Sequence, residues 1–351
     1  MKKTKFYKIH EKLGAKIVEF AGYLMPVQYS SIISEHKAVR NSAGVFDISH
    51  MGEIFVRGEK APEFVQYITI NNVSKLYPGK VQYSAMCYPD GGIVDDLLVY
   101  KLSADEFMLV VNASNIEKDF NWMRENNKWN IQLDNLSDDY SLLAVQGPNS
   151  QKLIQKICNR DLNLGYYHFF NTEISGVDVL VSRTGYTGEI GYELYFKGDE
   201  ITAGLIWNNL FESVNEYDLK PVGLGARDIL RLEMGYYLYG NDIDQTTNPL
   251  EAGLGWITKL DKDNFIGKKV LVKIKSEGIK RKLVPMLSEE KAFPRHGYDI
   301  ISEEKKIGTI TSGTISPILN KPIALGYVDK NYAAEGNLVN FLIRGKKLLQ
   351  R

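Results

Sequence analysis

Residues 80–103 have a pattern typical of a β-hairpin, with the sequence KVQYSAMCYPDGGIVDDLLVYKLS. The turn is Pro89-Asp90-Gly91-Gly92, in which proline fixes φ and glycine supplies the positive φ that a tight turn requires. The second arm, GGIVDDLLVY at 91–100, carries two neighbouring acids inside an apolar run. Because an ionised carboxylate in a buried strand is costly unless something pairs with it, these acids need a structural or functional explanation.

The two acids point to opposite faces of the predicted strand. Alternate side chains of a strand share a face, which groups Asp96 with Leu98 and Tyr100 and puts Asp95 on the other side. Asp96 and Tyr100 are about 13 Å apart at the rise of a strand, a span that an elongated ligand can bridge. An alternative stays open, in which one acid is exposed at a strand edge and the other caps a backbone group.

Other residues are candidates for the same site or for a structural role. Tyr83 lies on the preceding arm of the hairpin, and Asn112 lies at the end of the following strand. His50 is a candidate general base, although a lone histidine near a strand is more often structural. Arg227 is a candidate partner for a carboxylate ligand, with a surface arginine on a helix as the alternative. The glycines of TGYTGEIGYE (184–193) fit either a ligand cradle or a plain hairpin.

Helical and strand patterns alternate through the first two thirds of the chain. In residues 30–44, a serine predicts the start of a helix and a glycine predicts its end. Helices are predicted within 6–15, 30–44, 59–71, 106–126, 142–157, 200–215 and 224–240, a strand pair or bent strand within 45–58, and a second hairpin within 178–196.

From about residue 280 the chain shows short alternating strands separated by turns, which predicts a terminal all-β barrel or sandwich. The fold class is therefore α+β, with mostly antiparallel strands. A dinucleotide-binding fold is disfavoured, because Gly-Leu-Gly at 223–225 follows Lys-Pro rather than a buried strand and no third glycine completes the phosphate-binding pattern.

Composition limits the classes of function. The chain has 351 residues, and its 43 basic and 43 acidic residues cancel, which gives no support for a nucleic-acid binder. No apolar run approaches the ~20 residues of a membrane span. Cys87 and Cys158 form no CxxC pair, and the basic N-terminus has no apolar stretch behind it, so we expect a reduced, cytoplasmic setting.

No metal site is predicted from the sequence. The five histidines are scattered, without a second ligand at the spacing that a metal site requires. Asp242 and Asp244 in GNDID resemble part of a calcium loop but lack the remaining positions, so capping of a loop is the simpler interpretation.

Seven stretches occur in one order over most of the chain, from about residue 5 to residue 345. They are FDISHMGE (46–53), YPDGGIVDDL (88–97), VVNASNIEKD (110–119), LLAVQGP (142–148), SRTGYTGEIGYEL (182–194), GLGARDILRLEMGYYLYGND (223–242) and TSGTISP (311–317). Together they closely resemble the aminomethyltransferase family of the glycine cleavage system, the T-proteins.

The resemblance implies three domains arranged like a cloverleaf around a channel that holds tetrahydrofolate. Residues 1–54 with 153–243 would form the first α+β domain, 55–152 an inserted α+β domain, and 244–351 a β-barrel-like C-terminal domain. Members of the family continue past the strand near residue 345, whereas this sequence ends in KKLLQR, so the closure of the last domain is expected to differ.

The resemblance also implies a reaction. The family takes the aminomethyl group from the lipoyl arm of the H-protein, passes the one-carbon unit to tetrahydrofolate and releases ammonia. The key aspartate of the family falls on Asp96, which is expected to orient the folate, assist proton removal and stabilise cationic character. The implied folate site comprises Met51, Tyr83, Asp96, Leu98, Tyr100, Asn112, Tyr186, Glu193 and Arg227.

Two of these residues have implied partners on the folate. Glu193 is expected to accept from the amino-pyrimidine edge of the pterin, and Arg227 to pair with the glutamate carboxylate through its bidentate fork. Two related functions stay open: a folate-dependent demethylase, and a non-catalytic folate-binding protein. Relatives of the second kind carry a KGCYxGQE-type motif where this chain has SRTGYTGEIG.

Overall fold

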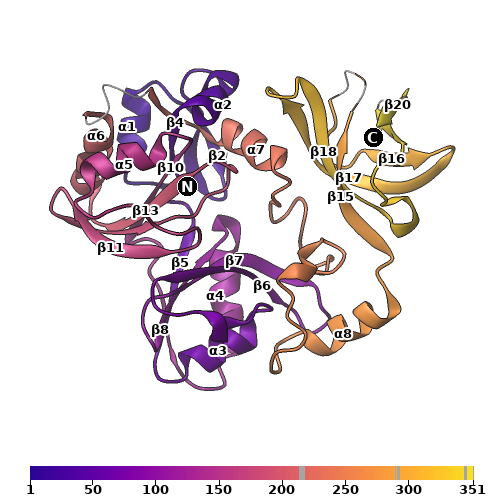
Figure 1. Cartoon of the computed structure of the whole chain (residues 1–351), viewed down its shortest axis with the longest axis horizontal. Coiled ribbons are helices and arrows are strands. Elements are labelled where there is room, and N and C mark those ends of the chain that lie inside the picture. Colours follow the sequence, from indigo (N-terminus) through magenta and orange to yellow (C-terminus); the bar gives the residue numbers. More distant parts are fainter. Residues whose placement is uncertain (213–217, 289, 291–292, 344–345, 351) are drawn as a thin grey trace. The chain divides into compact units, whose positions relative to one another are not determined.

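The structure is a computed structural model that describes residues 1–212, 218–288, 290, 293–343 and 346–350 (Figure 1). The chain divides into two compact units, each assembled from separate stretches of sequence. Unit 1 comprises Met1–Pro62, Lys75–Gln82 and Leu98–Leu230, and unit 2 comprises Glu63–Ser74, Tyr83–Leu97 and Arg231–Arg351. The three-domain division implied by the family resemblance stays a prediction.

The predicted hairpin of residues 80–103 is confirmed. Its arms are β6 (Lys80–Cys87) and β7 (Ile93–Lys101), which are neighbours in a five-stranded sheet of order β6-β7-β8-β5-β9. In the turn Gly91 has a φ of 88°, a conformation that favours glycine. The other strands of this sheet are β5 (Gly52–Arg57), β8 (Glu106–Val111) and β9 (Gln132–Asn135).

Unit 1 contains two further sheets. A six-stranded sheet has the order β11-β12-β13-β10-β4-β14 and is antiparallel except for the parallel β4–β14 pair. A three-stranded sheet has the order β1-β3-β2. The strands are β1 (Lys2–Lys3), β2 (Lys16–Phe20), β3 (Tyr23–Gln28), β4 (Ala43–Asp47), β10 (Tyr140–Gln146), β11 (Phe169–Ile174), β12 (Val177–Ser182), β13 (Gly191–Lys197) and β14 (Leu219–Pro221).

Helices occur in both units. Those of unit 1 are α1 (Tyr7–Lys12), α2 (Ile32–Asn41), α4 (Ile116–Glu125), α5 (Ser150–Ile157) and α6 (Glu200–Glu212), whereas α7 (Leu224–Glu233) begins in unit 1 and ends in unit 2. Helix α3 (Ala61–Ile68) crosses the boundary between the units, and α8 (Lys268–Glu277) belongs to unit 2. Short 3-10 turns are η1 (Val73–Lys75), η2 (Ala113–Asn115), η3 (Leu254–Trp256) and η4 (Lys330–Tyr332).

Strand β13 is buried on both faces. Tyr192 packs in one apolar cluster of unit 1 with Leu143 and Trp207, whereas Tyr195 packs in another with Tyr100. Positions 192 and 195 differ by an odd number, so their side chains leave the strand in opposite directions. The central position of β13 explains why its sequence is apolar on both faces except at Glu193 and at the exposed terminal Lys197.

The C-terminal part of unit 2 is a six-stranded antiparallel sheet of order β15-β18-β17-β16-β19-β20, which confirms the expected change to strands near residue 280 (Figure 1). Ile300, Ile310 and Phe341 are fully buried in its core. The strands are β15 (Arg281–Leu287), β16 (Asp299–Ser302), β17 (Lys305–Ser316), β18 (Lys321–Asp329), β19 (Val339–Ile343) and β20 (Lys346–Gln350).

The α+β class with antiparallel sheets is confirmed, but two helix ends differ from the prediction. Gly44 does not end α2; it lies in β4, where an added Cβ would come within 2.6 Å of the side chains of Val39 and Val222. The helix predicted over 224–240 ends at Glu233, because Gly235 takes a φ of 67° and the chain turns back. Of the helix predicted over 200–215, residues 213–215 lie outside the described part of the chain.

Gly-Leu-Gly at 223–225 follows β14, a short strand in which only Leu219 is buried, rather than a fully buried strand. The amide of Gly223 donates to the carboxylate of Glu35 at 2.9 Å, so a side chain of unit 1 already occupies this backbone donor. None of the helices in the described ranges is long and apolar enough to cross a membrane.

Candidate active site

Strand β7 separates its two acids as the alternation of side chains predicts. Asp95 is fully buried, whereas Asp96 is partly exposed. Leu97 and Val99 follow Asp95 into the interior, and Leu98 is partly exposed like Asp96. The acid with access to solvent is therefore the one on which the family's key aspartate falls.

Within unit 2, Tyr83 contacts Asp96 on one side and Trp256 on the other. The hydroxyl of Tyr83 donates to Oδ2 of Asp96 at 2.9 Å. The ring of Tyr83 stacks on that of Trp256, with centroids 6.2 Å apart and an interplanar angle of 27°. Trp256 ends the turn η3 and is 64% exposed, so an aromatic surface open to ligands lies directly behind the tyrosine that contacts the acid.

Glu193 lies in β13 of unit 1, with 6% of its surface exposed. Its Oε2 accepts hydrogen bonds from the hydroxyls of Thr184 at 2.5 Å and Tyr195 at 3.1 Å. Burial raises the pKa of Glu193, and the hydrogen bond from Thr184 and the positive charge of Arg227 oppose that rise. The carboxylate is thus held by neutral donors with a cation near it.

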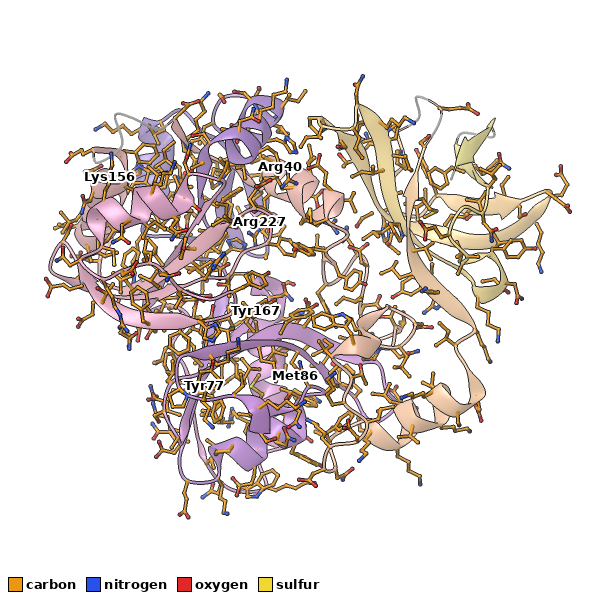
Figure 2. The ribbon with its side chains drawn as sticks, in the orientation of Figure 1. Arg40, Tyr77, Met86, Lys156, Tyr167 and Arg227 are labelled. Atoms are coloured by element: carbon orange, nitrogen blue, oxygen red, sulfur yellow. The ribbon has the colours of Figure 1, made fainter. Side chains whose placement is uncertain are left out.

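Arg227 extends from α7, and its guanidinium lies 4.8 Å from the ring centroid of Tyr186 (Figure 2). Burial lowers the pKa of Arg227, against the charges of Tyr186 and Glu193, which raise it. An arginine stacked on an aromatic ring and partly removed from water is suited to bind a carboxylate.

Arg40 forms hydrogen bonds both with the segment that follows Tyr186 and with α7 (Figure 2). Its Nη1 donates to the carbonyl of Thr187 at 2.6 Å and to the carboxylate of Glu189 at 2.9 Å. Its Nη2 donates to the carbonyl of Leu230 at 3.4 Å. These bonds fix the segment between β12 and β13 beside the helix that carries Arg227.

The remaining expected folate residues are in different environments. Tyr100 is fully buried, and its hydroxyl lies 3.0 Å from the hydroxyl of Tyr195. Met51 and Leu98 are partly buried and pack against the same apolar cluster of unit 1. Asn112 is partly buried at the end of β8. Unit 1 thus contains Met51, Leu98, Tyr100, Asn112, Tyr186, Glu193 and Arg227, and unit 2 contains Tyr83 and Asp96.

His50 is buried and does not have the properties of a general base at neutral pH. Its Nδ1 has no hydrogen-bond partner, and its ring meets that of Phe20 edge-on, with centroids 5.4 Å apart. Burial and the charge of Arg227 lower the pKa of His50 to about 4. The imidazole is therefore neutral and packed, which favours the structural interpretation.

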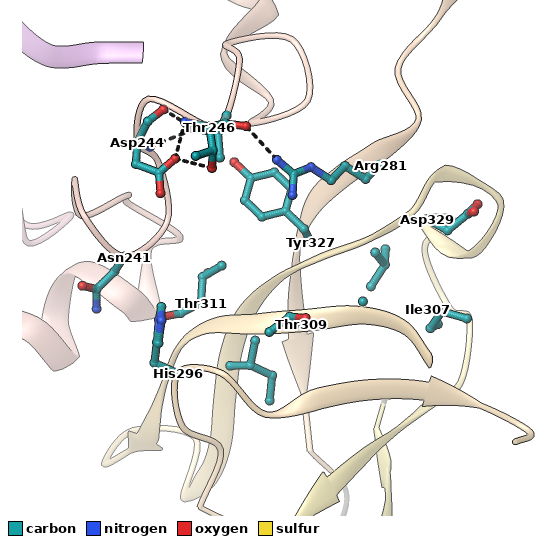
Figure 3. Close-up of a pocket in the computed structure, with 14 residues that line it drawn as sticks. Asn241, Asp244, Thr246, Arg281, His296, Ile307, Thr309, Thr311, Tyr327 and Asp329 are labelled. Carbon is teal, nitrogen blue, oxygen red and sulfur yellow. Dashed lines mark hydrogen bonds between the residues drawn. The ribbon is translucent and has the colours of Figure 1, made fainter. Parts of the chain in front are cut away.

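A cavity of about 270 Å³ lies in unit 2, and none of the residues expected for folate lines it (Figure 3). Arg281 on its wall donates to the carbonyl of Thr246 at 3.0 Å and forms an ion pair with Glu251 at 3.1 Å. Asp244 accepts from the amide and hydroxyl of Thr246, both at 2.7 Å, which is the loop capping expected for this acid. The guanidinium on the wall of the cavity is therefore already paired. Across the described ranges, no three His, Cys, Asp or Glu side chains gather as a metal site.

Three residues of these clusters escaped the sequence analysis. Thr184 and Tyr195 hold Glu193, and Tyr195 shares a strand face with Glu193 because the two are two positions apart. That alternation was available in the sequence. Trp256 offered no such signal, because it meets Tyr83 only through the fold.

Asp96 is thus a partly exposed acid that accepts a hydrogen bond from Tyr83, whose ring stacks on the exposed Trp256. Comparison with known proteins gives the kind of enzyme. Residues 6–262 match the model of the GCVT N-terminal domain, and residues 281–350 match that of the glycine cleavage T-protein C-terminal barrel domain.

Full-length relatives agree with this match. An aminomethyltransferase of Halothermothrix orenii is 52% identical, covering 99% of this chain and 97% of its own, and one of Flavobacterium psychrophilum is 51% identical, covering 100% and 98%. The crystal structure of glycine cleavage system aminomethyltransferase T from Bartonella henselae superposes with a TM-score of 0.92 at 34% identity, covering 99% of this chain and 96% of that one. The chain belongs to the glycine cleavage T-protein family and is an enzyme of the aminomethyltransferase kind.

Proposed function

We propose that this enzyme transfers the one-carbon unit of an aminomethyl group from the lipoyl arm of an H-protein to tetrahydrofolate, with release of ammonia. The observation that carries the proposal is the partly exposed Asp96 with Tyr83 donating to its Oδ2 at 2.9 Å. The carbon stays at one oxidation level throughout. Its bonds to sulfur and to the leaving nitrogen break, and two bonds to folate nitrogens form.

Asp96 acts on the reacting nitrogens and carbon. Its carboxylate orients the folate, assists removal of the proton from the attacking nitrogen and stabilises the cationic, iminium-like carbon. Tyr83 fixes one carboxylate oxygen and thereby the direction in which Asp96 faces. Trp256 in turn fixes the ring of Tyr83 by stacking.

The residues of unit 1 are proposed to bind the folate itself. Glu193 accepts from the amino-pyrimidine edge of the pterin, for which a buried carboxylate is suited. Arg227 pairs with the glutamate carboxylate and is held in place by Tyr186. Met51 and Leu98 supply apolar contacts at the edge of a packed cluster. Both cysteines are buried and free, which supports the proposal of a reduced, cytoplasmic compartment.

The test is transfer from H-protein loaded with the aminomethyl group. Ammonia and methylenetetrahydrofolate are expected only when both loaded H-protein and tetrahydrofolate are present. Replacing the H-protein by small methylated amines or sulfur compounds distinguishes the demethylase alternative, for which product would appear without H-protein. Absence of product from every donor, in an enzyme that binds folate, would contradict the proposal.

A substitution of Arg227 tests the proposed folate contact separately from the transfer reaction. Arg227→Ala is expected to weaken the affinity for tetrahydrofolate at least about tenfold, because a charged hydrogen bond to the glutamate carboxylate is lost. Titration calorimetry measures this affinity directly. An unchanged affinity would show that Arg227 does not pair with the ligand.

A further inference from the structure

A network of hydroxyl groups lies behind Glu193 in unit 1. Thr184 Oγ1 donates to Glu193 at 2.5 Å and lies 3.0 Å from Ser182 Oγ. Tyr195 donates to the same carboxylate oxygen at 3.1 Å and lies 3.0 Å from the hydroxyl of Tyr100. Tyr100 also reaches Ser182 Oγ at 3.1 Å. The four hydroxyls therefore form one connected cluster that ends on Oε2 of Glu193.

Because this cluster is buried, its hydrogen bonds have a large effect on the stability of the Glu193 charge. Tyr100 and Ser182 are fully buried, Tyr195 is 1% exposed and Thr184 is 3% exposed. A carboxylate in such surroundings loses most of its hydration, so each hydrogen bond to it contributes more than a hydrogen bond between neutral groups. The two donors to Glu193 are neutral, so they stabilise its negative charge without cancelling it.

Charged and titratable groups face Glu193 from several elements. Arg227 on α7 favours its ionised form, while Glu53 on β5 carries a second buried carboxyl whose two oxygens have no hydrogen-bond partner. Burial and the charge of Glu193 raise the pKa of Glu53 well above its usual range, which favours the protonated form of Glu53. The hydroxyls of Tyr100 and Tyr195 stay protonated, because burial and Glu193 raise the pKa of both.

We infer that Thr184 and Tyr195 are positioning residues, whose hydroxyls orient Glu193 and keep it an acceptor for the amino-pyrimidine edge of a folate. This inference rests on the proposed function and extends it to two residues that do not touch the ligand. Both hydroxyls donate to Oε2 of Glu193, and these two hydrogen bonds fix the plane of the carboxylate. In that orientation the carboxylate accepts from the two N–H donors of the pterin. Thr184 has the greater effect, since its hydrogen bond is shorter by 0.6 Å, the difference between 3.1 and 2.5 Å.

The consequence is a shift in the pH dependence of folate binding. Only ionised Glu193 accepts from both N–H groups, so affinity falls when the pH drops through the pKa of this residue. The Thr184 hydrogen bond lowers that pKa, and its removal raises it. The loss of affinity is then reached at a higher pH than in the wild type.

The experiment measures binding of 5-formyltetrahydrofolate, a stable reduced folate, by titration calorimetry between about pH 4 and pH 8. Thr184→Val has nearly the same shape without the hydroxyl, and is expected to raise the pH midpoint of affinity. Thr184→Ser retains a hydroxyl and is expected to restore the wild-type midpoint. Tyr195→Phe is expected to shift the midpoint in the same direction by a smaller amount.

A matched control lies in the same segment. Thr187 is fully buried, and its hydroxyl donates to Gln146 at 3.0 Å instead of to Glu193. Thr187→Val removes an equivalent buried hydroxyl and is expected to leave the pH midpoint unchanged, even where it lowers stability. A shift in this control as large as that of Thr184→Val would overturn the inference.

Failure of the inference is distinguishable from failure of the proposed function. If the wild type binds no reduced folate at any pH, the proposed function itself is wrong. If the wild type binds and both Thr184→Val and Tyr195→Phe keep its pH midpoint, the positioning role is wrong. Should Thr184→Val not fold, Tyr195→Phe and Thr184→Ser decide the question by the same measurement.

Discussion

Two aspartates of unit 2 are held in opposite ways. Asp242 is fully buried, and its Oδ2 lies 2.6 Å from Nη1 of Arg231 and accepts from the amide of Leu238 at 2.9 Å. Its Oδ1 accepts from the hydroxyl of Thr311 at 2.5 Å. Asp96 is partly exposed, and the group that donates to its Oδ2 is the neutral hydroxyl of Tyr83.

Under the proposed function, the difference separates an acid of the scaffold from an acid of the site. A buried carboxylate with a cation, an amide and a hydroxyl on its two oxygens is compensated, and removal of its partner is costly. An acid beside a neutral donor keeps its charge available for a ligand that develops positive charge. Glu193 in unit 1 follows the second pattern, with two hydroxyl donors and, within the described residues, no salt bridge to a basic side chain.

The largest stability effect is expected at the scaffold acid. Asp242→Asn leaves the buried guanidinium of Arg231 without its negative partner and is expected to cost about 3–5 kcal/mol of unfolding free energy. Denaturant unfolding of the variant and the wild type measures this loss. A loss below about 1 kcal/mol would remove the distinction between the two aspartates.

The pH dependence of stability tests a third buried titratable group, His50. Because the pKa of His50 is about 4 in the folded state and about 6.5 when unfolded, the unfolded chain binds the extra proton between these values. His50 therefore contributes full stability above about pH 6.5 and loses about 3 kcal/mol as the pH falls to about 4. Unfolding free energies measured over this window are expected to fall less steeply in His50→Gln. An unchanged slope would contradict the burial of an unpaired imidazole.

A smaller effect is expected from the donor to the site acid. Tyr83→Phe keeps the ring that stacks on Trp256 but removes the hydroxyl that fixes Asp96, so turnover is expected to fall about tenfold with little loss of stability. Tyr239→Phe is the matched control, since the hydroxyl of Tyr239 donates to the carbonyl of Ile93 at 3.1 Å in the same unit. The control is expected to change stability and to keep the turnover number. The reverse pattern would sink the role given to Tyr83.

The smallest effect is expected at Glu53. Glutamine has nearly the shape of a protonated glutamate, so Glu53→Gln is expected to change the unfolding free energy at neutral pH by less than about 0.5 kcal/mol. A clear stabilisation would mean that the native carboxyl is ionised, because substitution would then remove a buried charge that lacks a hydrogen bond.

The local parts of this fold were predictable from the sequence, and the long-range parts were not. The turn residues around Gly91 and the alternation along β7 specify the hairpin and place Asp95 and Asp96 on opposite faces. Gly44 was misinterpreted because its small size serves packing against Val39 and Val222, which no local pattern reveals.

The same division applies to the candidate site. The ordered motifs identified the family, and the comparisons confirm it. The residues that hold Glu193 share its strand or the preceding segment, so a strand alternation could have indicated Tyr195. The stacking of Trp256 on Tyr83 depends on how distant segments of unit 2 pack, and nothing near either residue specifies it.

The most direct test of the central claim is single-turnover transfer from aminomethyl-loaded H-protein to tetrahydrofolate by the wild type, Asp96→Asn and Asp95→Asn. Loss of the carboxylate charge at 96 is expected to slow transfer at least about a hundredfold, while unfolding free energy stays near that of the wild type. Asp95→Asn, on the opposite face of β7, is expected to keep the rate within a few fold. A near-normal rate in Asp96→Asn, or an equal loss in both variants, would contradict the assignment of Asp96 as the catalytic carboxylate.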